Sequence, residues 1–407
     1  MKWKIYGAII LALALAVTIP AACQPIEPTL TPTATVEIEP TVTPTDIPGP
    51  TETATPPEPT ATAVVPTATP TLTGELPEGA IIIEPGGSIS DAVRQAEPGD
   101  VFVVLAGEYN ESVRISTSGT AEQPITLMAW GAVTINGGSS SAITTSDADY
   151  WTIQGFTLRS TDEWAIQASS WSCRYDSSCD GAVHWELHNL TVYGQTFHWG
   201  SYLLMEGCEL DGSSTHEHGV YAAYTHHNTY RNNEVHHFRL SGIREQGLNH
   251  NALIEDNHVY DIGGANLTIG ISADGHNNSQ YEHIIRGNLV ENVDGTCIEL
   301  ENTFASLVEG NELHGCGDTS ITVIGYAAPA CKENGGYGGD DCWNAIFGVT
   351  VSNNTISSPH LGLVLYHAGG VTLVDNVLNV RLCSLVTDNP PNVTWVGNVC
   401  NGQPYED

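Results

Sequence analysis

Short apolar runs broken by turn residues recur along this 407-residue chain, from about residue 150 to its end. Typical units read ALIEDNHV, HIIRGNLV and VTLVDNVL, in which a polar turn separates two apolar segments. The units return with a period in the twenties. Strands this short cannot bury an apolar face alone, so the pattern predicts a solenoid in which each coil packs against the next.

One turn position of the repeat is held by Gly or Asn throughout. It falls at Gly155, Asn189, Gly207, Asn233, Asn257, Asn288, Asn311, Asn354, Asn376 and Asn398. Asn tolerates left-handed backbone angles, and stacked amide side chains can hydrogen-bond to one another. We therefore expect these residues to form a structural ladder and not a catalytic site.

A second strand follows most of these turns, as in SGIREQG, IGISADG and TCIELEN. Its aligned apolar residues are expected to face inward: Val220, Ile243, Ile271, Ile298, Ile321 and Leu363. Because side chains alternate along a strand, the residues between them face outward in two rows. The first row is Tyr221, Arg244, Ser272, Glu299, Thr322 and Val364, and the second is Ala223, Gln246, Asp274, Glu301, Ile324 and Tyr366. Glu245 would point inward, which requires a partner in the core or a bulge.

The N-terminal part of the chain does not follow the repeat. Residues 1–22 are expected to be a secretory signal peptide, because a short apolar run follows Lys2 and Lys4. The Ala-Ala-Cys ending resembles a bacterial lipoprotein signal, which predicts lipidation of Cys23, with ordinary secretion as the alternative. Residues 23–73 are rich in Thr and Pro and predict a disordered linker. The repeat domain would span 74–407 and begin with a short helix capped by Ser90.

The repeat domain is strongly acidic. After residue 73 it contains 41 Asp and Glu against 10 Lys and Arg, a net charge of about −31. This balance argues against nucleic acid and anionic membrane surfaces as partners, so a lipid anchor is the one membrane contact that we expect. The same charge should repel a polyanionic sugar unless cations intervene. A monomer is expected.

Nine cysteines follow Cys23, and disulfides are the first expectation for them in an exported protein. The expected pairs are Cys173 with Cys179, Cys331 with Cys342, Cys297 with Cys316 and Cys383 with Cys400. Cys208 is left over, and its apolar surroundings favour a buried structural thiol over a nucleophile.

The segment EPGDVFVVLAGEYNESV and the repeat that follows it resemble the pectate-lyase-like superfamily of exported proteins. The resemblance covers roughly Ile81 to Cys400. It implies an all-β fold, a single-stranded right-handed parallel β-helix of about 10–12 coils with a short N-terminal capping helix. The superfamily includes lyases, hydrolases, epimerases, esterases and adhesins, so the resemblance does not imply one activity.

The outward rows concentrate acidic residues on neighbouring coils. Equivalent positions lie about 4.8 Å apart, so Asp274 should stack on Glu301, with Glu299 and Arg244 nearby. Like charges at this spacing repel unless a cation or a proton lies between them. Three interpretations stay open: a calcium site formed by Asp274, Glu299 and Glu301, a glycoside hydrolase pair formed by Asp274 and Glu301, or a solvated acidic face.

Arg244 is the candidate base. In the β-helical lyases that this chain resembles, an Arg or Lys removes the proton α to a uronate carboxylate, and calcium or another cation neutralises that carboxylate. Arg244 is proposed for this role by position alone, because no catalytic motif of those families is found here. A structural ion pair is the alternative.

Histidines and aromatic residues flank the same face. His226 and His250 occupy equivalent turn positions and are expected to stack. His250 is a candidate acid or base, and the candidates for substrate binding are His226, His276, Tyr221 and Gln246. Neighbouring histidines such as His236 and His237 do not by themselves specify a zinc site, which needs three or four converging ligands.

Together these features predict an exported, cell-surface protein that cleaves a uronate-containing polysaccharide by β-elimination, with calcium as cofactor. A glycoside hydrolase of the same fold and a non-catalytic glycan-binding protein are the alternatives.

Overall fold

The computed structural model describes residues 75–169, 183–247, 249–265, 267–275, 280–325, 348–387 and 392–405. The expected signal peptide, Cys23 and the linker lie outside these residues, and so does His276. The same holds for the expected disulfides of Cys173 with Cys179 and of Cys331 with Cys342. The described strands belong to one compact unit, Val65–Asp407. None of the helices in this part of the chain has the length and apolarity needed to cross a membrane.

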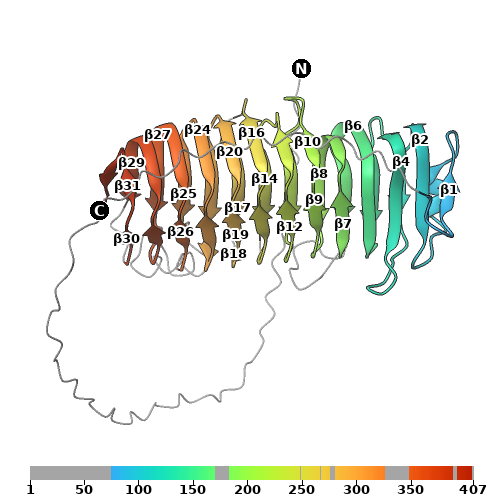
Figure 1. Cartoon of the computed structure of the whole chain (residues 1–407), viewed down its shortest axis with the longest axis horizontal. Helices are drawn as coiled ribbons and strands as arrows, with labels where there is room; N and C mark the ends of the chain where they lie inside the picture. Colours follow the sequence, from blue (N-terminus) through green and yellow to red (C-terminus); the bar gives the residue numbers. More distant parts are fainter. Residues whose placement is uncertain are drawn as a thin grey trace, which may run out of the picture. The chain divides into compact units, whose positions relative to one another are not determined.

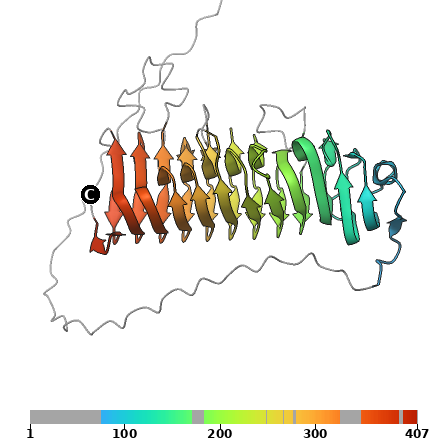
Figure 2. The same ribbon diagram turned by 90° about the horizontal axis from the view of Figure 1, so that it is seen from above.

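The described strands wind into a parallel β-helix whose coils stack side by side along one axis (Figures 1 and 2). Among them only β31 (Val399–Cys400) and β32 (Gln403–Pro404) pair in antiparallel fashion. A separate short pair joins β18 (Gln280–Tyr281) to β22 (Thr303–Phe304). The expected all-β solenoid is confirmed.

Each full coil contributes to three strand stacks, which we call faces A, B and C. Face A contains β7 (Trp185–His188), β9 (Leu204–Glu206), β12 (Thr229–Arg231), β15 (Leu253–Glu255), β19 (Ile284–Arg286), β23 (Leu307–Glu309), β26 (Thr350–Ser352), β28 (Thr372–Val374) and β30 (Thr394–Val396). Face B contains β10 (Glu209–Asp211), β13 (Glu234–His236), β16 (His258–Ile262), β20 (Leu289–Val293) and β24 (Glu312–Cys316). Face C contains β11 (His218–Ala223), β14 (Ser241–Gln246), β17 (Ile269–Asp274), β21 (Thr296–Glu301) and β25 (Thr319–Ile324). Longer strands run through more than one face: β6 (Trp151–Ser169), β8 (Thr191–Trp199), β27 (Thr355–Tyr366) and β29 (Val377–Thr387).

The N-terminal coils carry a short helix. Their strands are β1 (Ile81–Ile83), β2 (Val101–Tyr109), β3 (Val113–Ile115), β4 (Ile125–Asn136) and β5 (Ile143–Ser146). Helix α1 (Ile89–Val93) buries its first and last residues against them. The N-cap is Ser88, so the expected cap at Ser90 is wrong. Ser88 has an extended backbone and its side chain accepts the Asp91 N–H, whereas Ser90 already lies inside the helix.

Face C follows the predicted alternation. The aligned residues from Val220 to Leu363 are buried and in register from coil to coil. The glycines in the second position of β11, β14 and β17 also face the core, where a Cβ added to Gly242 would collide with Val259. This close packing explains why the second residue of each of these strands is small.

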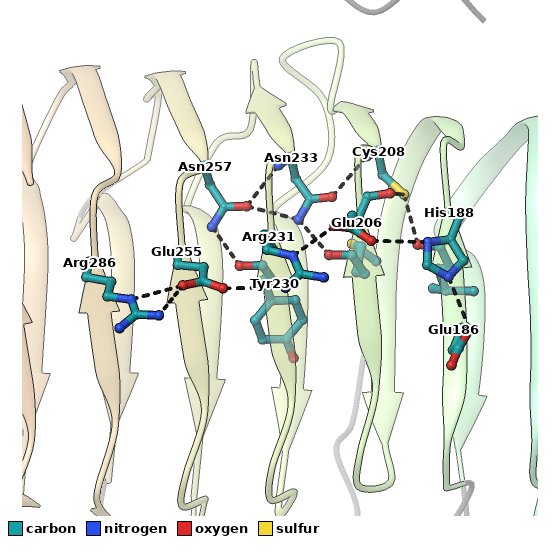
Figure 3. Close-up of polar contacts among 12 residues, drawn as sticks. Glu186, His188, Glu206, Cys208, Tyr230, Arg231, Asn233, Glu255, Asn257 and Arg286 are labelled. Carbon is teal, nitrogen blue, oxygen red and sulfur yellow. Dashed lines mark hydrogen bonds and ion pairs between the residues drawn. The ribbon is translucent and has the colours of Figure 1, made fainter. Parts of the chain in front are cut away.

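Stacked asparagines join the coils at the turn between faces A and B. From Asn233 to Asn376 each side-chain Nδ2 donates to the Oδ1 of the next ladder residue at 2.9–3.0 Å, and Asn398 ends the series. Figure 3 shows the first of these bonds, between Asn233 and Asn257. Each also donates to a backbone carbonyl, as Asn257 does to Tyr230 at 2.9 Å. The structural ladder is confirmed.

The ladder asparagines were expected to adopt left-handed backbone angles themselves, and this is wrong. The residue with a left-handed backbone is the one before each ladder asparagine, such as Asn232 with φ 54° and Asp256 with φ 54°. Gly155, Asn189 and Gly207 belong to that left-handed column. The ladder position in the Gly207 coil is therefore held by Cys208, whose N–H donates to the Oδ1 of Asn233 at 3.0 Å.

Two of the expected disulfides join neighbouring coils. Cys297 bonds to Cys316 and Cys383 bonds to Cys400, with Cα atoms 5.5 and 6.1 Å apart. Cys208 is free and buried. Burial raises the pKa of its thiol to about 12, so it stays protonated and unreactive at neutral pH, as expected.

Replacing one ladder residue should destabilise the whole domain. Asn288→Ala removes the bonds to Asn257, Asn311 and a backbone carbonyl and leaves buried partners unpaired. We expect a loss of about 3–5 kcal/mol in the free energy of unfolding, measured with urea. Asn379→Ala, at an exposed strand position, is the matched control and should change it by less than about 0.5 kcal/mol. Equal effects of the two variants would contradict the role of the ladder.

A buried histidine should make the fold sensitive to acid. Burial lowers the pKa of His283 to about 3, and its Nδ1 accepts the Ala252 N–H at 3.3 Å. The unfolded chain protonates near pH 6.5, so below that pH stability should fall by about 1.4 kcal/mol per pH unit from this residue. His283→Gln should remove this part of the slope in urea unfolding between about pH 6.5 and pH 5. His360→Gln, at an exposed site, should leave the slope unchanged. An unchanged slope in both variants would show that His283 is not the sensor.

Candidate functional site

Three consecutive strands of face C carry the charged cluster. Register places Gln246 on β14 opposite Asp274 on β17, and Asp274 opposite Glu301 on β21. Glu299 projects from β21 opposite Ser272 in the neighbouring row. The predicted stacking of the carboxylates is therefore confirmed.

A line of polar contacts holds Asp274 in place. Its Oδ2 pairs with the guanidinium of Arg244 and accepts the Gln246 Nε2 donor at 3.1 Å. Gln246 accepts in turn from the Tyr221 hydroxyl. Asp274 is only 3% exposed, while Arg244, Gln246 and Tyr221 keep partial access to solvent. Arg244 lies opposite Ser272 in the sheet, so it reaches diagonally to its partner.

The two glutamates of β21 differ from Asp274 in how readily they ionise. Burial, together with the negative charge of Asp274, raises the pKa of Glu299 to about 7. Burial and the charge of Asp274, to which Glu301 hydrogen-bonds, raise the pKa of Glu301 to about 9. At neutral pH the cluster therefore combines a protonated Glu301, which can donate a hydrogen bond, with a Glu299 whose pKa lies close to the pH of the solution.

Face A shows how unusual this arrangement is. One outward column there runs His188, Glu206, Arg231, Glu255 and Arg286, so that acids alternate with basic residues (Figure 3). Arg231 bonds to Glu206 at 2.8 Å, and Arg286 bonds to Glu255 at 2.6 and 2.9 Å. On face C the acids instead stack on one another, and a single arginine offsets them.

Aromatic rings continue the outward rows of face C toward the N-terminal coils. Phe197 lies opposite Tyr221 in the register, and their rings stack with centroids 5.7 Å apart. Trp164 and Trp199 pack against Phe197 at 4.8 and 5.0 Å. The partly exposed rings of Trp164, Trp199 and Tyr221 pack around the buried Phe197. They form an aromatic surface that adjoins Arg244 and suits the flat faces of sugar rings.

His218 is a site neighbour that the sequence did not single out. It lies on β11, its Nδ1 contacts the Ser241 hydroxyl at 2.7 Å, and its ring lies 4.9 Å from that of Tyr221. Burial, with a smaller effect of Arg244, lowers the pKa of His218 to about 3, so the ring is neutral. Its alignment with Ser241 at the start of the strand was the signal that could have revealed it.

The expected histidine stack forms in the turn after face C. His226 and His250 pair across coils with ring centroids 4.9 Å apart and an interplanar angle of 10°, and Tyr281 extends the stack at 4.6 Å from His250. The stack lies a few residues beyond the row that contains Gln246 and Asp274. A chemical role for either histidine stays a prediction.

Glu245 points inward without a bulge, and it is paired in the core. Its carboxylate accepts from Tyr230 at 2.7 Å, from Thr225 at 3.0 Å and from Asn228 at 3.2 Å, and also from Asn249. Burial raises the pKa of Glu245, and these hydrogen bonds act in the opposite sense. The network fixes β14 from inside, directly behind Arg244 and Gln246.

The chain matches a family model described as "Right handed beta helix region" over residues 132–335. This match supports the right-handed sense of the expected winding. A comparison with curated protein sequences finds no match.

Several solved structures share the fold. The mannuronan C-5 epimerase AlgE6 A-module of Azotobacter vinelandii is 14% identical, with a TM-score of 0.51 over 78% of this chain and 94% of that chain. A GH136 lacto-N-biosidase from Eubacterium ramulus is 14% identical, with a TM-score of 0.54 over 78% and 67%. A mannuronic acid specific family 6 polysaccharide lyase from the human gut microbiota is 11% identical, with a TM-score of 0.51 over 80% and 91%. At these identities the likeness concerns the fold.

Removing the charge of Asp274 should lower the pKa of both glutamates of β21, since that charge raises them. We expect Asp274→Asn to shift the pKa values of Glu299 and Glu301 toward those of ordinary glutamates. Carbon-13 NMR of the carboxyl groups in calcium-free buffer measures these titrations. Asp375→Asn, an exposed residue with a left-handed backbone that Asn tolerates, should leave them unchanged. Burial alone should keep both pKa values above the ordinary value, so titrations of Glu299 and Glu301 that are unchanged in Asp274→Asn would disprove the coupling.

Proposed function

Because the chain belongs to the family of right-handed β-helix regions, we propose that it is an exported polysaccharide lyase that acts on a uronate-containing glycan at face C. The observation that carries this proposal is one guanidinium, Arg244, held among carboxylates beside a surface of aromatic rings. A uronate polymer has carboxylates that can pair with the Arg244 guanidinium and flat ring faces that can stack on the aromatic rings. An epimerase and a lyase named for mannuronate polymers give a precedent for such substrates on this fold.

β-Elimination requires three groups. One group neutralises the uronate carboxylate, a base removes the proton α to it, and an acid protonates the glycosidic oxygen as the C–O bond breaks and a C=C bond forms. Arg244 is paired with Asp274, and an arginine guanidinium is not deprotonated in proteins, so it has no lone pair to accept a proton. We therefore assign Arg244 to the substrate carboxylate and not to the role of base.

The glutamates of β21 can supply the proton transfers. Glu299, with a pKa of about 7, can accept a proton near neutral pH. Glu301, with a pKa of about 9, is protonated there and can act as the acid. Tyr221 and Gln246 would orient the sugar, since both belong to the line of contacts that holds Asp274.

Calcium binding is the alternative role for the same carboxylates, because glutamates that bind the ion are ionised and cannot also serve as acid and base. Asp274, Glu299 and Glu301 offer only oxygen ligands, and the raised pKa values of the two glutamates reflect burial and a repulsion that a divalent cation would relieve. An ion held there would supply positive charge opposite the uronate carboxylate. If the protein keeps its lyase activity in the presence of a chelator, Glu299 and Glu301 act in proton transfer and do not bind calcium.

A glycoside hydrolase is the second candidate, with a different pair of carboxylates from the one expected. Asp274 and Glu301 are hydrogen-bonded, which is closer than the roughly 5–5.5 Å of retaining enzymes or 6.5–9.5 Å of inverting enzymes. Glu299 and Glu301 project from the same side of β21, two residues and thus roughly 6.6 Å apart along the strand. That spacing fits an inverting pair better.

The N-terminal sequence supports placing the enzyme at the cell surface. A signal ending in Ala-Ala-Cys would attach a lipid to Cys23, and the Thr- and Pro-rich residues 24–73 would hold the β-helix away from the membrane. This arrangement suits action on an external polymer.

The lyase assignment predicts unsaturated products. Purified protein incubated with a panel of uronate polymers should release products that absorb in the ultraviolet. Arg244→Ala should lower kcat/KM by roughly 100-fold, because the substrate carboxylate loses its positive partner, and Arg244→Lys should recover part of it. Arg286→Ala, which removes a paired arginine of face A, is the matched control and should keep full activity.

The alternatives give different results in the same assay. New reducing ends without ultraviolet absorbance would indicate the hydrolase. Binding without products on every substrate would indicate a glycan-binding protein. Full lyase activity in Arg244→Ala would place the active site elsewhere.

A further inference from the structure

A group of potential metal ligands lies away from face C, at the turn between faces B and C. It consists of Asp211 at the end of β10, His236 at the end of β13 and His237, the next residue. Register places Asp211 directly opposite His236, and a left-handed backbone at His237, with φ 58°, turns the second ring toward the first. From these residues we propose a binding site for a divalent transition-metal ion of the zinc class.

The ligand atoms converge on one point. The Nδ1 atoms of His236 and His237 lie 2.7 Å apart, and Oδ1 of Asp211 lies 3.8 and 3.4 Å from them. Bonds of about 2.0–2.1 Å place the ligands of a tetrahedral zinc ion roughly 3.3 Å from one another. The observed distances bracket this value, so small movements of the two rings complete the site.

The other nitrogen of each ring faces a carboxylate. Nε2 of His236 lies 3.6 Å from Glu209, and Nε2 of His237 lies 3.7 Å from Asp261. In metal sites of this kind the ligating imidazole donates its second N–H to a carboxylate, which fixes the ring and strengthens the ligand. Both Nε2 atoms lie beyond hydrogen-bond distance of their carboxylates, but near enough that a small movement of each ring would form the bond.

Hydrogen-bonding rules disfavour the metal-free arrangement with neutral rings. If the two Nδ1 atoms share one hydrogen, the ring that carries it has a bare Nε2, which then faces Glu209 or Asp261, acceptor against acceptor. Indeed Nε2 of His236 is buried without a hydrogen-bond partner. A metal ion on both Nδ1 atoms removes the conflict, because both Nε2 atoms are then protonated toward the carboxylates.

The surroundings hold the rings and leave one side open. The ring of His236 is 6% exposed and stacks on Tyr260 at 4.8 Å, and Tyr260 is fixed by its bond to Glu234 at 2.6 Å. The side chain of His237 is about half exposed and that of Asp211 partly so. A fourth coordination position can therefore take water or a ligand, as in zinc sites with three protein ligands. Imidazole ligands favour zinc, nickel, copper and iron over calcium.

A second pair of adjacent histidines provides a matched control. His226 and His227 also have facing Nδ1 atoms, 3.0 Å apart, and His227 has a left-handed backbone with φ 57°. Within the described residues they belong to no group of three potential ligands. The proposal thus predicts zinc at one pair and not at the other.

The test is zinc binding to the chelator-treated, dialysed protein by isothermal titration calorimetry in the presence of excess calcium. Wild type should bind one zinc ion per chain at this site, and Asp211→Asn and His237→Asn should each weaken binding by more than about 100-fold. Asp211→Asn keeps the oxygen that accepts the Ser213 N–H at 2.7 Å, and Asn tolerates the backbone of His237, so both variants should fold, as circular dichroism can verify. His227→Asn should bind as wild type does.

Cobalt substitution gives an independent readout. Wild type and His227→Asn should show the visible absorption of nitrogen- and oxygen-coordinated cobalt, and Asp211→Asn should lose it. Absence of zinc binding in wild type, or binding by Asp211→Asn and His237→Asn that is as tight as in wild type, would overturn the proposal. Loss of binding in His227→Asn alone would do so too, because it would place the metal at the other pair.

Discussion

The register between coils is the constraint on which the rest of this molecule depends. Parallel strands at about 4.8 Å spacing place each residue directly over its equivalent on the next coil. The buried amide column from Asn233 to Asn398 fixes that register, since each member bonds to the next and to a backbone carbonyl. A slip of one residue would turn every inward side chain outward. Equivalent side chains on the surface therefore stack in columns that run from coil to coil.

Stacking places side chains of like charge next to one another, and the molecule compensates this repulsion in two ways. On face A acids alternate with arginines, so that Arg231 lies between Glu206 and Glu255. On face C the acids of β17 and β21 are adjacent, and a proton shared between Asp274 and Glu301 takes the place of a basic residue. The first arrangement is satisfied without a ligand. The second gains from any cation or substrate that relieves it, which is why we place the activity there.

Much of the fold could be predicted from the sequence because a solenoid turns long-range contacts into a local repeat. Aligning the units was enough to place Ile243 over Ile271 and Asp274 under Glu301, and to pair Cys297 with Cys316. The prediction of the turn was wrong because it depended on an offset of a single residue. The left-handed turn residue and the ladder residue are neighbours, and either can be Asn, so the first coils were aligned one position early.

The contacts that define the sites are harder to infer, because they run across columns. Arg244 reaches diagonally to Asp274 and not to the residue opposite it. Glu245 is satisfied by Tyr230 and Asn228, which come from a different face of the coil. Asp211 meets His237 only because a left-handed backbone turns that ring back. Each contact needs a side-chain direction that periodicity does not encode.

The acidity of the domain does not exclude a polyanionic substrate from face C. At physiological ionic strength charges farther than about 8 Å are largely screened, so the charge that a bound uronate meets is the local one. There Arg244 offsets Asp274, and the raised pKa values keep Glu301 and part of Glu299 uncharged. The cluster is thus far less negative than its composition suggests. Burial of the two glutamates makes their ionisation unfavourable, and this would let a carboxylate-rich surface accept another carboxylate.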